Sequence, residues 1–529
     1  MESRPPLFVL AGAFLCYYLR FGYDYAQSDQ DEFIPYLLHQ LNPARFAEDW
    51  LVHLQATEFS VRTYFVWLVQ FFSTIMPVWL AILILYTACW LCIAWSVWKI
   101  AWCFTADRLV ASGAVFVTLL ATPVWTLGGN DLVHGMLVPS MAGWAIGGLA
   151  VYLFLKSRPL ASAVLLGVAC WMQALVGLQL AALLCITQLP DCLREHKRPL
   201  RRLIAFSLVF AACALPTLGP IFYQQVLVTT PQETDPSLFY IMAEFRNPHH
   251  YLPGSFHPKR MLGFALIAGA GLAALAWQPV KQQLRHRKFL LRILVAIAVF
   301  CITGWVFTEI IPVLAIAKVQ LFKTTVLAKV LLIITAGSAV NALLPHGIRR
   351  MLHGFLRHER IGAITVAAAW IIAMALTLPE NGYLHNKVGP WKRAAAPIGA
   401  VQKWVRTHTP HDAVFATPPS LSSFRSEAQR AIVVNHKAIP FTDRHMITWF
   451  ERLTDLAPVG RPERGSPDLL YRLDAAFESL TERQLVELGQ RYKFRHVLRS
   501  TPLPEPLSAF RQVFSAENLF VYERSNHAI

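Results

Sequence analysis

VWLAILILYTACWLCIA, residues 78–94, is an apolar run without a charged side chain. A helix needs ~20 mostly apolar residues to cross the hydrocarbon core of a bilayer, so this run predicts a membrane span. Similar runs occupy residues 109–124, 261–277 and 361–378. The whole chain is 55% hydrophobic and only 15% charged, whereas a soluble domain has about a quarter of its residues charged. These observations predict a polytopic integral membrane protein.

The apolar segments end near residue 380, and they predict a mainly α-helical bundle of about 10 spans, some of them short or broken. The spans are assigned to an N-terminal segment ending near residue 23 and to residues 80–101, 109–125, 136–155, 160–189, 203–223, 261–279, 290–307, 326–344 and 361–378. Residues 160–189 have basic residues on both sides, which conflicts with a single crossing. We therefore predict a pair of short helices broken near Gln173.

The formal net charge of +16 is concentrated in short segments between the apolar runs. Basic clusters lie at residues 194–202, 281–292 and 349–360. Short basic loops favour the cytoplasmic side of a membrane, so this distribution indicates topology and argues against nucleic acid as a partner. With the N-terminus in the cytoplasm, residues 24–62 and 224–260 are long external loops, and the chain after residue 380 is extracytoplasmic.

The composition changes after about residue 381, where short alternating elements replace the long apolar runs. We predict helices and strands in alternation: helices at 398–408, 446–456 and 481–492, and strands at 413–416, 431–434, 494–498 and 519–522. Thr481 is the predicted N-cap of the last helix. This alternation predicts a small extracytoplasmic α/β domain at residues 381–529, after a transmembrane domain at residues 1–380.

Several kinds of site are missing from the sequence. The C-terminal domain has no Gly-rich phosphate loop, nucleophile elbow or paired-histidine metal motif. The nine cysteines fall between Cys16 and Cys301 and lack the spacing of a metal site. Cysteines in apolar helices usually act as small packing residues, so we predict neither a zinc site nor a structural disulfide.

The strongest cluster of ionisable residues is the first external loop. Residues 24–32 read DYAQSDQDE, and a second acidic pair follows at Glu48 and Asp49. Carboxylates this close repel one another unless a cation, a metal or water separates them. Asp29, Asp31 and Glu32 are therefore candidate catalytic bases, and Asp29 and Asp31 are also candidate ligands of Mg²⁺ or Mn²⁺. The alternative is a solvated acidic loop that only sets topology.

Basic and aromatic residues gather in the second external loop and near the ends of later spans. Guanidinium and ammonium groups suit a phosphate or pyrophosphate at the membrane surface. The candidates for this role are Arg246, His249, His250, Lys259, Arg260, Lys318 and Lys323. Interfacial anchoring with snorkelling cations is the alternative. Secondary candidates are Asp131, His134 and Glu244.

Within the C-terminal domain, one stretch has the features of a cover over a substrate cavity. It comprises Pro418, Pro419 and Ser420, together with Arg425 and Arg430. A structural lid or an assembly surface explains the same residues equally well.

Three segments, at residues 29–50, 246–251 and 404–419, resemble a family of bacterial multi-span membrane proteins. That family lies within the superfamily of C-class glycosyltransferases, which use polyprenyl-phosphate-linked sugars. The acidic first external loop, the short or broken spans and the external α/β domain resemble the same superfamily. The likeness covers most of the chain as architecture and rests on short motifs.

The resemblance implies an enzyme of the bacterial cytoplasmic membrane that transfers a sugar from a polyprenyl-phosphate donor to a lipid, glycan or protein acceptor outside. It implies that one of Asp29, Asp31 and Glu32 is the catalytic base. It also implies that the lipid phosphate meets basic residues, namely Arg246, His249, His250 and Lys323. The acids read Asp-Gln-Asp-Glu rather than an isolated Asp-Glu pair, which leaves the choice of base open.

Two other functions remain open from the sequence. A transporter or flippase needs ionisable residues near the bilayer midplane and usually has an internal repeat. The sequence has no evident repeat, and its acids gather on one side, which favours the enzyme. A non-catalytic assembly protein of a cell-envelope glycan pathway fits the same topology.

Overall fold

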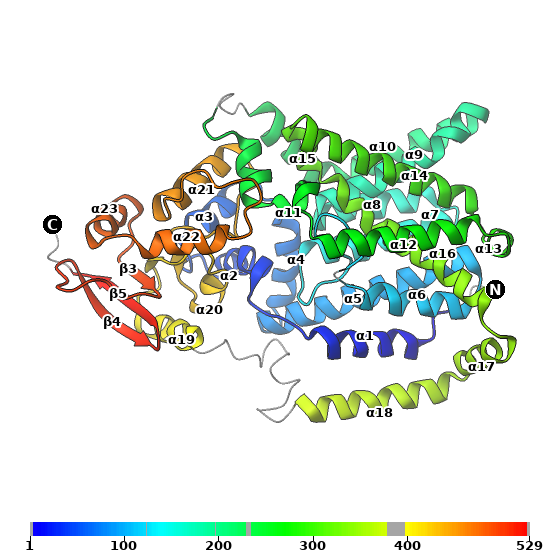
Figure 1. Ribbon diagram of the computed structural model, residues 1–529, viewed down its shortest axis with the longest axis horizontal. Coiled ribbons are helices and arrows are strands. Elements are labelled where there is room, and N and C mark those ends of the chain that lie inside the picture. The colour runs from blue at the N-terminus through cyan, green and yellow to red at the C-terminus, as the bar shows by residue number, and fades with distance from the viewer. Residues whose placement is uncertain (1–3, 123, 196, 229–233, 378–396, 526–529) are drawn as a thin grey trace. The chain divides into compact units, whose positions relative to one another are not determined.

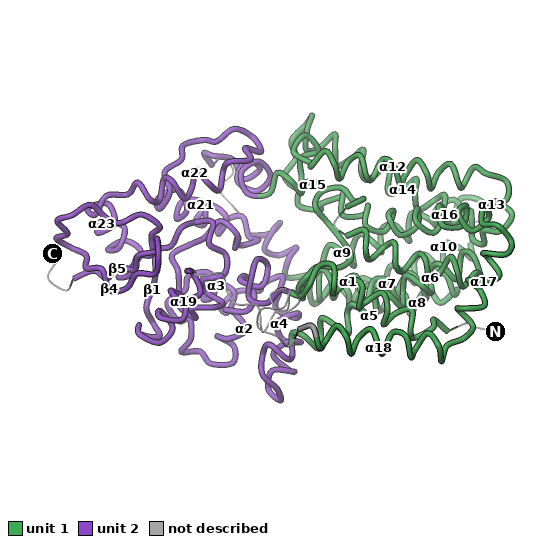
Figure 2. The backbone as a smooth tube through the Cα atoms, turned by 60° about the horizontal axis from the view of Figure 1, so that its bottom comes forward, with its two compact units in different colours: residues 1–23, 82–220, 247–388 green, residues 24–81, 221–246, 389–529 purple. Residues whose placement is uncertain are grey.

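The structure of the protein, a computed structural model, describes all residues except 1–3, 123, 196, 229–233, 378–396 and 526–529 (Figure 1). The chain forms two compact units that alternate along the sequence (Figure 2). We call residues 1–23, 82–220 and 247–388 the helical unit, and residues 24–81, 221–246 and 389–529 the mixed unit. The predicted domain boundary at residue 380 lies outside the described residues. The whole of the first predicted external loop, residues 24–62, is grouped with the C-terminal segment, whereas the second loop, residues 224–260, is divided between the two units after residue 246.

The helical unit is built from helices that are mostly long and apolar. They are α1 (Leu7–Phe21), α5 (Val78–Thr105, which begins in the mixed unit), α6 (Arg108–Leu120), α7 (Pro139–Leu155), α8 (Pro159–Met172), α9 (Ala174–Glu195), α10 (Lys197–Phe222), α11 (Pro248–Tyr251), α12 (Pro258–Ala276), α13 (Gln278–Gln283), α14 (Arg287–Trp305), α15 (Leu314–Val319), α16 (Thr325–Leu343), α17 (His346–Arg357) and α18 (Glu359–Thr377). Each predicted span coincides with one or two of these helices, so the prediction of a mainly helical, multi-span protein is confirmed.

Six helical stretches among the described residues are long and apolar enough to cross a membrane, and a seventh is added if the bent pair α17 and α18 counts as one span. Four shorter apolar helices, α1, α6, α7 and α8, lie on segments that we predicted as spans. Short helices of this kind were expected, and the total of about 10 spans stays a prediction.

The predicted break near Gln173 is confirmed. Helix α8 ends at Met172, Gln173 has extended backbone angles, and α9 begins at Ala174. The two helices pack against each other, and a Cβ on Gly177 would lie 2.5 Å from the carbonyl oxygen of Leu166. Only glycine allows the backbones to approach so closely, so this residue permits the tight hairpin.

Small residues also bring other helices of this unit together. A Cβ on Gly271 of α12 would lie 3.0 Å from Cα of Leu332 on α16, and one on Gly167 of α8 would lie 2.9 Å from the backbone of Cys213 on α10. Association of helices in lipid depends on such close packing, because the lipid tails are as apolar as the side chains. These contacts explain why glycines are tolerated inside the spans.

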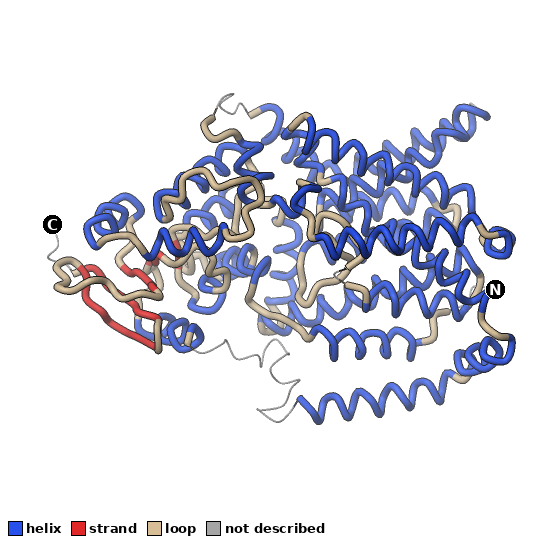
Figure 3. The backbone as a smooth tube through the Cα atoms, in the orientation of Figure 1, coloured by secondary structure: helices blue, strands red, loops and turns tan. Residues whose placement is uncertain are grey.

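The mixed unit contains all the described strands (Figure 3). Its elements are the 3₁₀ turn Ser28–Glu32, α2 (Ile34–Leu41), α3 (Trp50–Thr57), α4 (Thr63–Ser73), the π-helical turns Tyr223–Leu227 and Tyr240–Arg246, α19 (Ile398–His408), β1 (Val414–Ala416), α20 (Phe424–Ala428), β2 (Ala431–Ile432), α21 (Asp443–Leu456), α22 (Leu469–Glu478), α23 (Glu482–Tyr492), β3 (His496–Arg499), β4 (Phe510–Ala516) and β5 (Leu519–Arg524). The strand order is β2-β1-β3-β5-β4. The small α/β fold is confirmed.

The sheet is parallel on one side and antiparallel on the other. Strand β1 pairs in parallel with β2 and β3, and β5 pairs antiparallel with β3 and β4. Phe415 at the centre of β1 is buried with Val401 and Val405 of α19, Phe424 of α20 and Leu498 of β3. Helices α19 and α20 are therefore fixed to the sheet by one continuous apolar core.

In this unit the sequence predicted two features accurately, the bounds of α19 and the N-cap of α23. Helix α19 has the predicted bounds, and Thr481 caps α23 through a reciprocal pair of hydrogen bonds with Gln484. Strand β2 is shorter than predicted, and β4, α20 and α22 were not predicted. The missed strand β4 pairs with β5 as a hairpin and has a register shift between Gln512 and Phe514, which obscures its alternation.

Candidate active site

The acidic part of the first external loop is a single 3₁₀ turn, Ser28–Glu32, followed by α2. The chain enters it with Ala26 and Ser28 at φ of 58° and 49°, in a region that residues other than glycine rarely adopt. The side chain of Gln30 accepts a hydrogen bond of 2.7 Å from the backbone N–H of Ala26. Backbone strain of this sort persists where surrounding contacts impose it.

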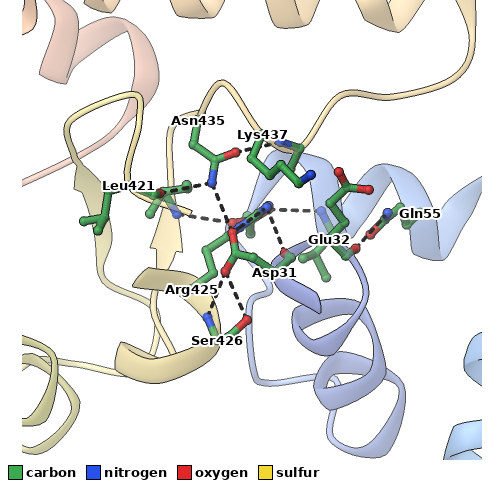
Figure 4. Close-up of polar contacts among 12 residues, drawn as sticks. Asp31, Glu32, Gln55, Leu421, Arg425, Ser426, Asn435 and Lys437 are labelled. Atoms are coloured by element: carbon green, nitrogen blue, oxygen red, sulfur yellow. Dashed lines mark hydrogen bonds and ion pairs between the residues drawn. The ribbon is translucent and has the colours of Figure 1, made fainter. Parts of the chain in front are cut away.

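Asp31, inside this turn, is held by several polar contacts (Figure 4). Its buried carboxylate lies 3.2 Å from Nη2 of Arg425 on α20. It also accepts hydrogen bonds from the backbone N–H and hydroxyl of Ser426, at 3.2 and 3.0 Å, and from the amide of Asn435, at 3.1 Å. Burial raises the pKa of Asp31, while Arg425 and Ser426 act to lower it. Because both oxygens are engaged, Asp31 acts as a fixed partner of the C-terminal segment.

Arg425 binds a second carboxylate from the same loop. Its Nη1 lies 3.5 Å from Oδ1 of Asp49, which also caps α3 by accepting from the N–H of Val52. The other oxygen of Asp49 accepts from the N–H of Ile432 in β2, at 3.2 Å. Asp31 and Asp49 thus hold one buried guanidinium between them. We call these three residues the Arg425 clamp.

Buried Glu32, the neighbour of Asp31 in sequence, forms an ion pair with half-buried Arg62. Its carboxylate contacts the guanidinium of Arg62, the residue that precedes α4. Burial lowers the pKa of Arg62 to about 10, opposed by Asp29 and assisted by the positive charges of Arg246 and Arg425. Arg62 therefore interacts electrostatically with Glu32, Asp29, Arg246 and Arg425, and we call these five residues the charged cluster.

Asp29 differs from its neighbours because it is partly exposed. Its side chain is 43% exposed and forms an ion pair with Lys437, which is itself 30% exposed. The backbone carbonyl of Lys437 accepts a hydrogen bond from Arg246 at the end of the π-helical turn Tyr240–Arg246. Asp29 and Arg246, which are far apart in sequence, therefore both contact Lys437. That they share a substrate site stays a prediction. Glu244, one of the secondary candidates, lies 4.0 Å from Arg464.

The remaining candidates belong to the helical unit. His250 makes a 2.6 Å hydrogen bond with the carbonyl oxygen of Gly128, and its ring lies 4.1 Å from that of His249. Lys323 is buried in a 3₁₀ turn that leads into α16. Asp131 pairs with Lys329 at 3.1 Å, and both side chains are buried. His134 follows on the same loop, Lys318 lies in α15, and Lys259 and Arg260 lie in the first turn of α12.

These residues form their own groups within the helical unit. That they meet Asp29 and Arg246 around one substrate stays a prediction. The pair His249 and His250 packs on Gly128 and Gly129, both at φ of 65°. Glycine is needed there, because a Cβ on Gly128 would lie 3.0 Å from the carbonyl oxygen of His250.

The acidic turn does not fit a metal site. Hard cations such as Mg²⁺ need several free oxygen ligands, whereas the carboxylate of Asp31 is engaged by Arg425, Ser426 and Asn435. Across the described part of the chain, no group of three or more His, Cys, Asp or Glu side chains is arranged to hold a metal ion. We therefore assign no step to a metal.

Small cavities lie in both units. One of about 20 Å³ in the helical unit is lined mainly by apolar residues, and one of about 10 Å³ in the mixed unit lies against Asp49, Arg425 and Asn435. A water molecule needs about 10–15 Å³, so each has room for roughly one. The second cavity places a water-sized space beside the Arg425 clamp.

The sequence did not reveal Arg62, Lys437 or the role of Arg425. Arg425 and Arg430 were considered only as a cover over a cavity. Arg430 instead donates to the backbone oxygens of Arg406 and Thr409, which ties α19 to the following segment. One feature of the sequence could have indicated these cations. The acidic residues Asp29, Asp31, Glu32 and Asp49 need positively charged partners if the fold buries them, even in part.

Comparisons with known proteins give two matches. A family model described as a domain of unknown function (DUF6798) matches residues 396–456, which include Arg425, Asn435 and Lys437. The crystal structure of ArnT from Cupriavidus metallidurans in the apo state is similar with a TM-score of 0.47 and 15% sequence identity, over 98% of this chain and 97% of that chain. A likeness of this degree does not assign roles to residues. No curated protein is similar in sequence.

Proposed function

We propose that this protein is a membrane glycosyltransferase that transfers a sugar from a polyprenyl-phosphate-linked donor to a lipid, glycan or protein acceptor. In this proposal Asp29 is the general base, and the mixed unit lies on the extracytoplasmic side of the bacterial cytoplasmic membrane. The resemblance in sequence motifs and the external acidic loop motivate the reaction class. The observation that carries the choice of base is the contrast between partly exposed Asp29 and buried Asp31 and Glu32.

The proposed reaction is a direct displacement. Asp29 accepts the proton of the acceptor hydroxyl, whose oxygen attacks the anomeric carbon of the donor sugar. The bond between that carbon and the phosphate oxygen breaks, and polyprenyl phosphate leaves with the electron pair. The configuration at the anomeric carbon is inverted.

The leaving phosphate gains negative charge, which nearby cations stabilise. Lys437 and Arg246 are suited to this role because both lie at the Asp29 end of the cluster. Lys437 acts as a point charge, and Arg246 offers the planar fork that matches phosphate oxygens. Arg62 and Arg425 are occupied by Glu32, Asp31 and Asp49, so we assign them to holding the loop.

The test is turnover of radiolabelled polyprenyl-phosphate sugars by the purified full chain. Asp29→Asn should lower turnover by about 10²–10⁴-fold, the usual contribution of a general base. Glu48→Gln, an exposed acid of the same external segment, is the matched control and should retain activity. Retained turnover in Asp29→Asn removes Asp29 as the base.

The same preparations separate the competing functions. Reconstituted protein that moves the labelled lipid between leaflets without cleaving it is a transporter. Protein that neither cleaves nor moves any donor of this class, while remaining folded, contradicts the proposal and favours an assembly role.

A further inference from the structure

The basic cluster at residues 349–360, which the sequence analysis used only as a topology signal, is mostly helical. Helix α17 spans His346–Arg357, and a 77° bend at His358 separates it from the apolar helix α18. If α18 crosses the bilayer, α17 runs close to the membrane plane. The basic cluster therefore lies on a short helix at the membrane surface, and not in the irregular loop that the sequence analysis assumed.

The outward residues of α17 divide into two opposite faces. Ile348, Met351 and Phe355 are 45%, 65% and 48% exposed, and their spacing of three and four residues puts them on one side. Arg350 and Arg357 are exposed and seven residues apart, on the opposite side. An apolar stripe on one side of a helix and basic residues on the opposite side are typical of helices that lie in the membrane interface.

A third face fixes α17 to the helical unit. Leu356 is buried with Phe8 and Val9 of α1, and Arg349 donates to the carbonyl oxygen of Asn341 at 2.6 Å. Because these contacts set the rotation of the helix, the exposed apolar stripe is a permanent feature of the surface. Exposed apolar side chains that line up on one helix face mark a surface that another apolar partner covers. The apolar helix α18, which follows α17 directly, predicts a bilayer as that partner.

We propose that α17 lies in the membrane interface and binds anionic glycerophospholipid, with Arg350 and Arg357 contacting the lipid phosphates. Ile348, Met351 and Phe355 enter the acyl-chain region, while the guanidinium groups remain at the level of the headgroups. The positive-inside rule assigns this surface to the cytoplasmic leaflet. The inference does not depend on the proposed enzymatic function.

The test uses the full chain in detergent, mixed with phosphatidylglycerol and phosphatidylcholine, with retained lipids counted by native mass spectrometry. The double variant Arg350→Gln/Arg357→Gln should lower the preference for phosphatidylglycerol about five-fold for each charge removed, and high salt should abolish the difference. The control pair Arg483→Gln/Arg511→Gln changes the net charge equally on exposed sites of the mixed unit and should leave the preference unchanged.

A second variant tests the apolar face separately. Ile348→Ser/Met351→Ser keeps every charge and should weaken retention of phosphatidylglycerol at both low and high salt, since apolar burial is not screened. If both α17 variants retain phosphatidylglycerol as the control pair does, the proposal is overturned. A change of the same size in the control pair also overturns it, because the preference then follows net charge alone.

Discussion

The two units bury charge in different ways. In the helical unit, Lys329 has one carboxylate partner, Asp131 at 3.1 Å, and one carbonyl partner, Ala121 at 3.3 Å. The second carboxylate oxygen of Asp131 is buried and has no hydrogen-bond partner among the described residues. In the mixed unit, Arg425 joins Asp31 and Asp49, and Asp31 is further hydrogen-bonded by Ser426 and Asn435.

The difference shows which acids are available for chemistry. A buried charge is stable only when its partners satisfy it, and removing one partner leaves an uncompensated charge. Arg425, Ser426 and Asn435 together satisfy the carboxylate of Asp31, so Asp31 holds the loop. Asp29, by contrast, is 43% exposed. In the Asp131–Lys329 pair, one carboxylate oxygen of Asp131 has no hydrogen-bond partner among the described residues. The stability of this pair therefore depends more on the single ion pair with Lys329.

Breaking the clamp should have the largest effect. Arg425→Met leaves Asp31 and Asp49 buried without their cation, and we expect a loss of at least about 3–5 kcal/mol in unfolding free energy. Thermal unfolding of the purified chain measures it, with Arg483→Met as the control on an exposed site. Arg425→Lys should recover only part of the loss, because an ammonium lacks the planar fork. An Arg425→Met protein as stable as the control contradicts the clamp.

Breaking the pair in the helical unit should cost less, since one carboxylate is left behind and not two. Lys329→Met is expected to destabilise the protein by about 3 kcal/mol, the low end for a broken buried pair. The double variant Lys329→Met/Asp131→Leu should return close to the wild-type melting temperature, because apolar residues of similar volume replace both charges. The comparison fails if the double variant is as unstable as the single one.

Acid should weaken one contact of the mixed unit selectively. Burial on its own raises the pKa of Glu482, but the N–H groups of Ala509, Phe510 and Ser508 together lower it below its ordinary value. A carboxyl with a lowered folded pKa stabilises the fold above its unfolded pKa of about 4.3, and this contribution is lost as the pH falls through the folded value.

Hydrogen exchange at the start of β4 measures that loss. Protection of the Ala509 and Phe510 amides should fall as the pH is lowered through the range below about 4.3. In Glu482→Gln this fall should be absent, because the amide does not titrate in that range. Equal acid sensitivity in both proteins would assign the effect to other carboxyls.

The sequence predicted the fold better than the site, for physical reasons. Long apolar runs, the break near Gln173 and the Thr481 cap are local signals, and the structure has all three. Helix α20 and strand β4 carry weaker local patterns and depend on packing against distant segments, so they were missed.

The partners of the acidic turn were not predictable from local pattern. Asp31 and Arg425 are 394 residues apart, and nothing in the spacing of either residue indicates the other. The sequence indicated that the acids need a cation, a metal or water between them, but it did not identify Arg62, Arg425 or Lys437 as their partners. It did not distinguish Asp29 from Asp31, because burial decides their roles and burial follows from the tertiary fold.

The smallest stability effect should come from the residue with the largest catalytic effect. Asp29 and Lys437 form a partly exposed ion pair, and such pairs contribute about 0–1 kcal/mol. Asp29→Asn should therefore keep the wild-type melting temperature while losing turnover, whereas Asp31→Asn should lower the melting temperature because Arg425 loses much of its compensation. Lys437→Gln is the matched control and should resemble Asp29→Asn in stability. If Asp29→Asn destabilises the protein as much as Asp31→Asn does, both acids are structural, and the base of the proposed reaction has to be sought elsewhere.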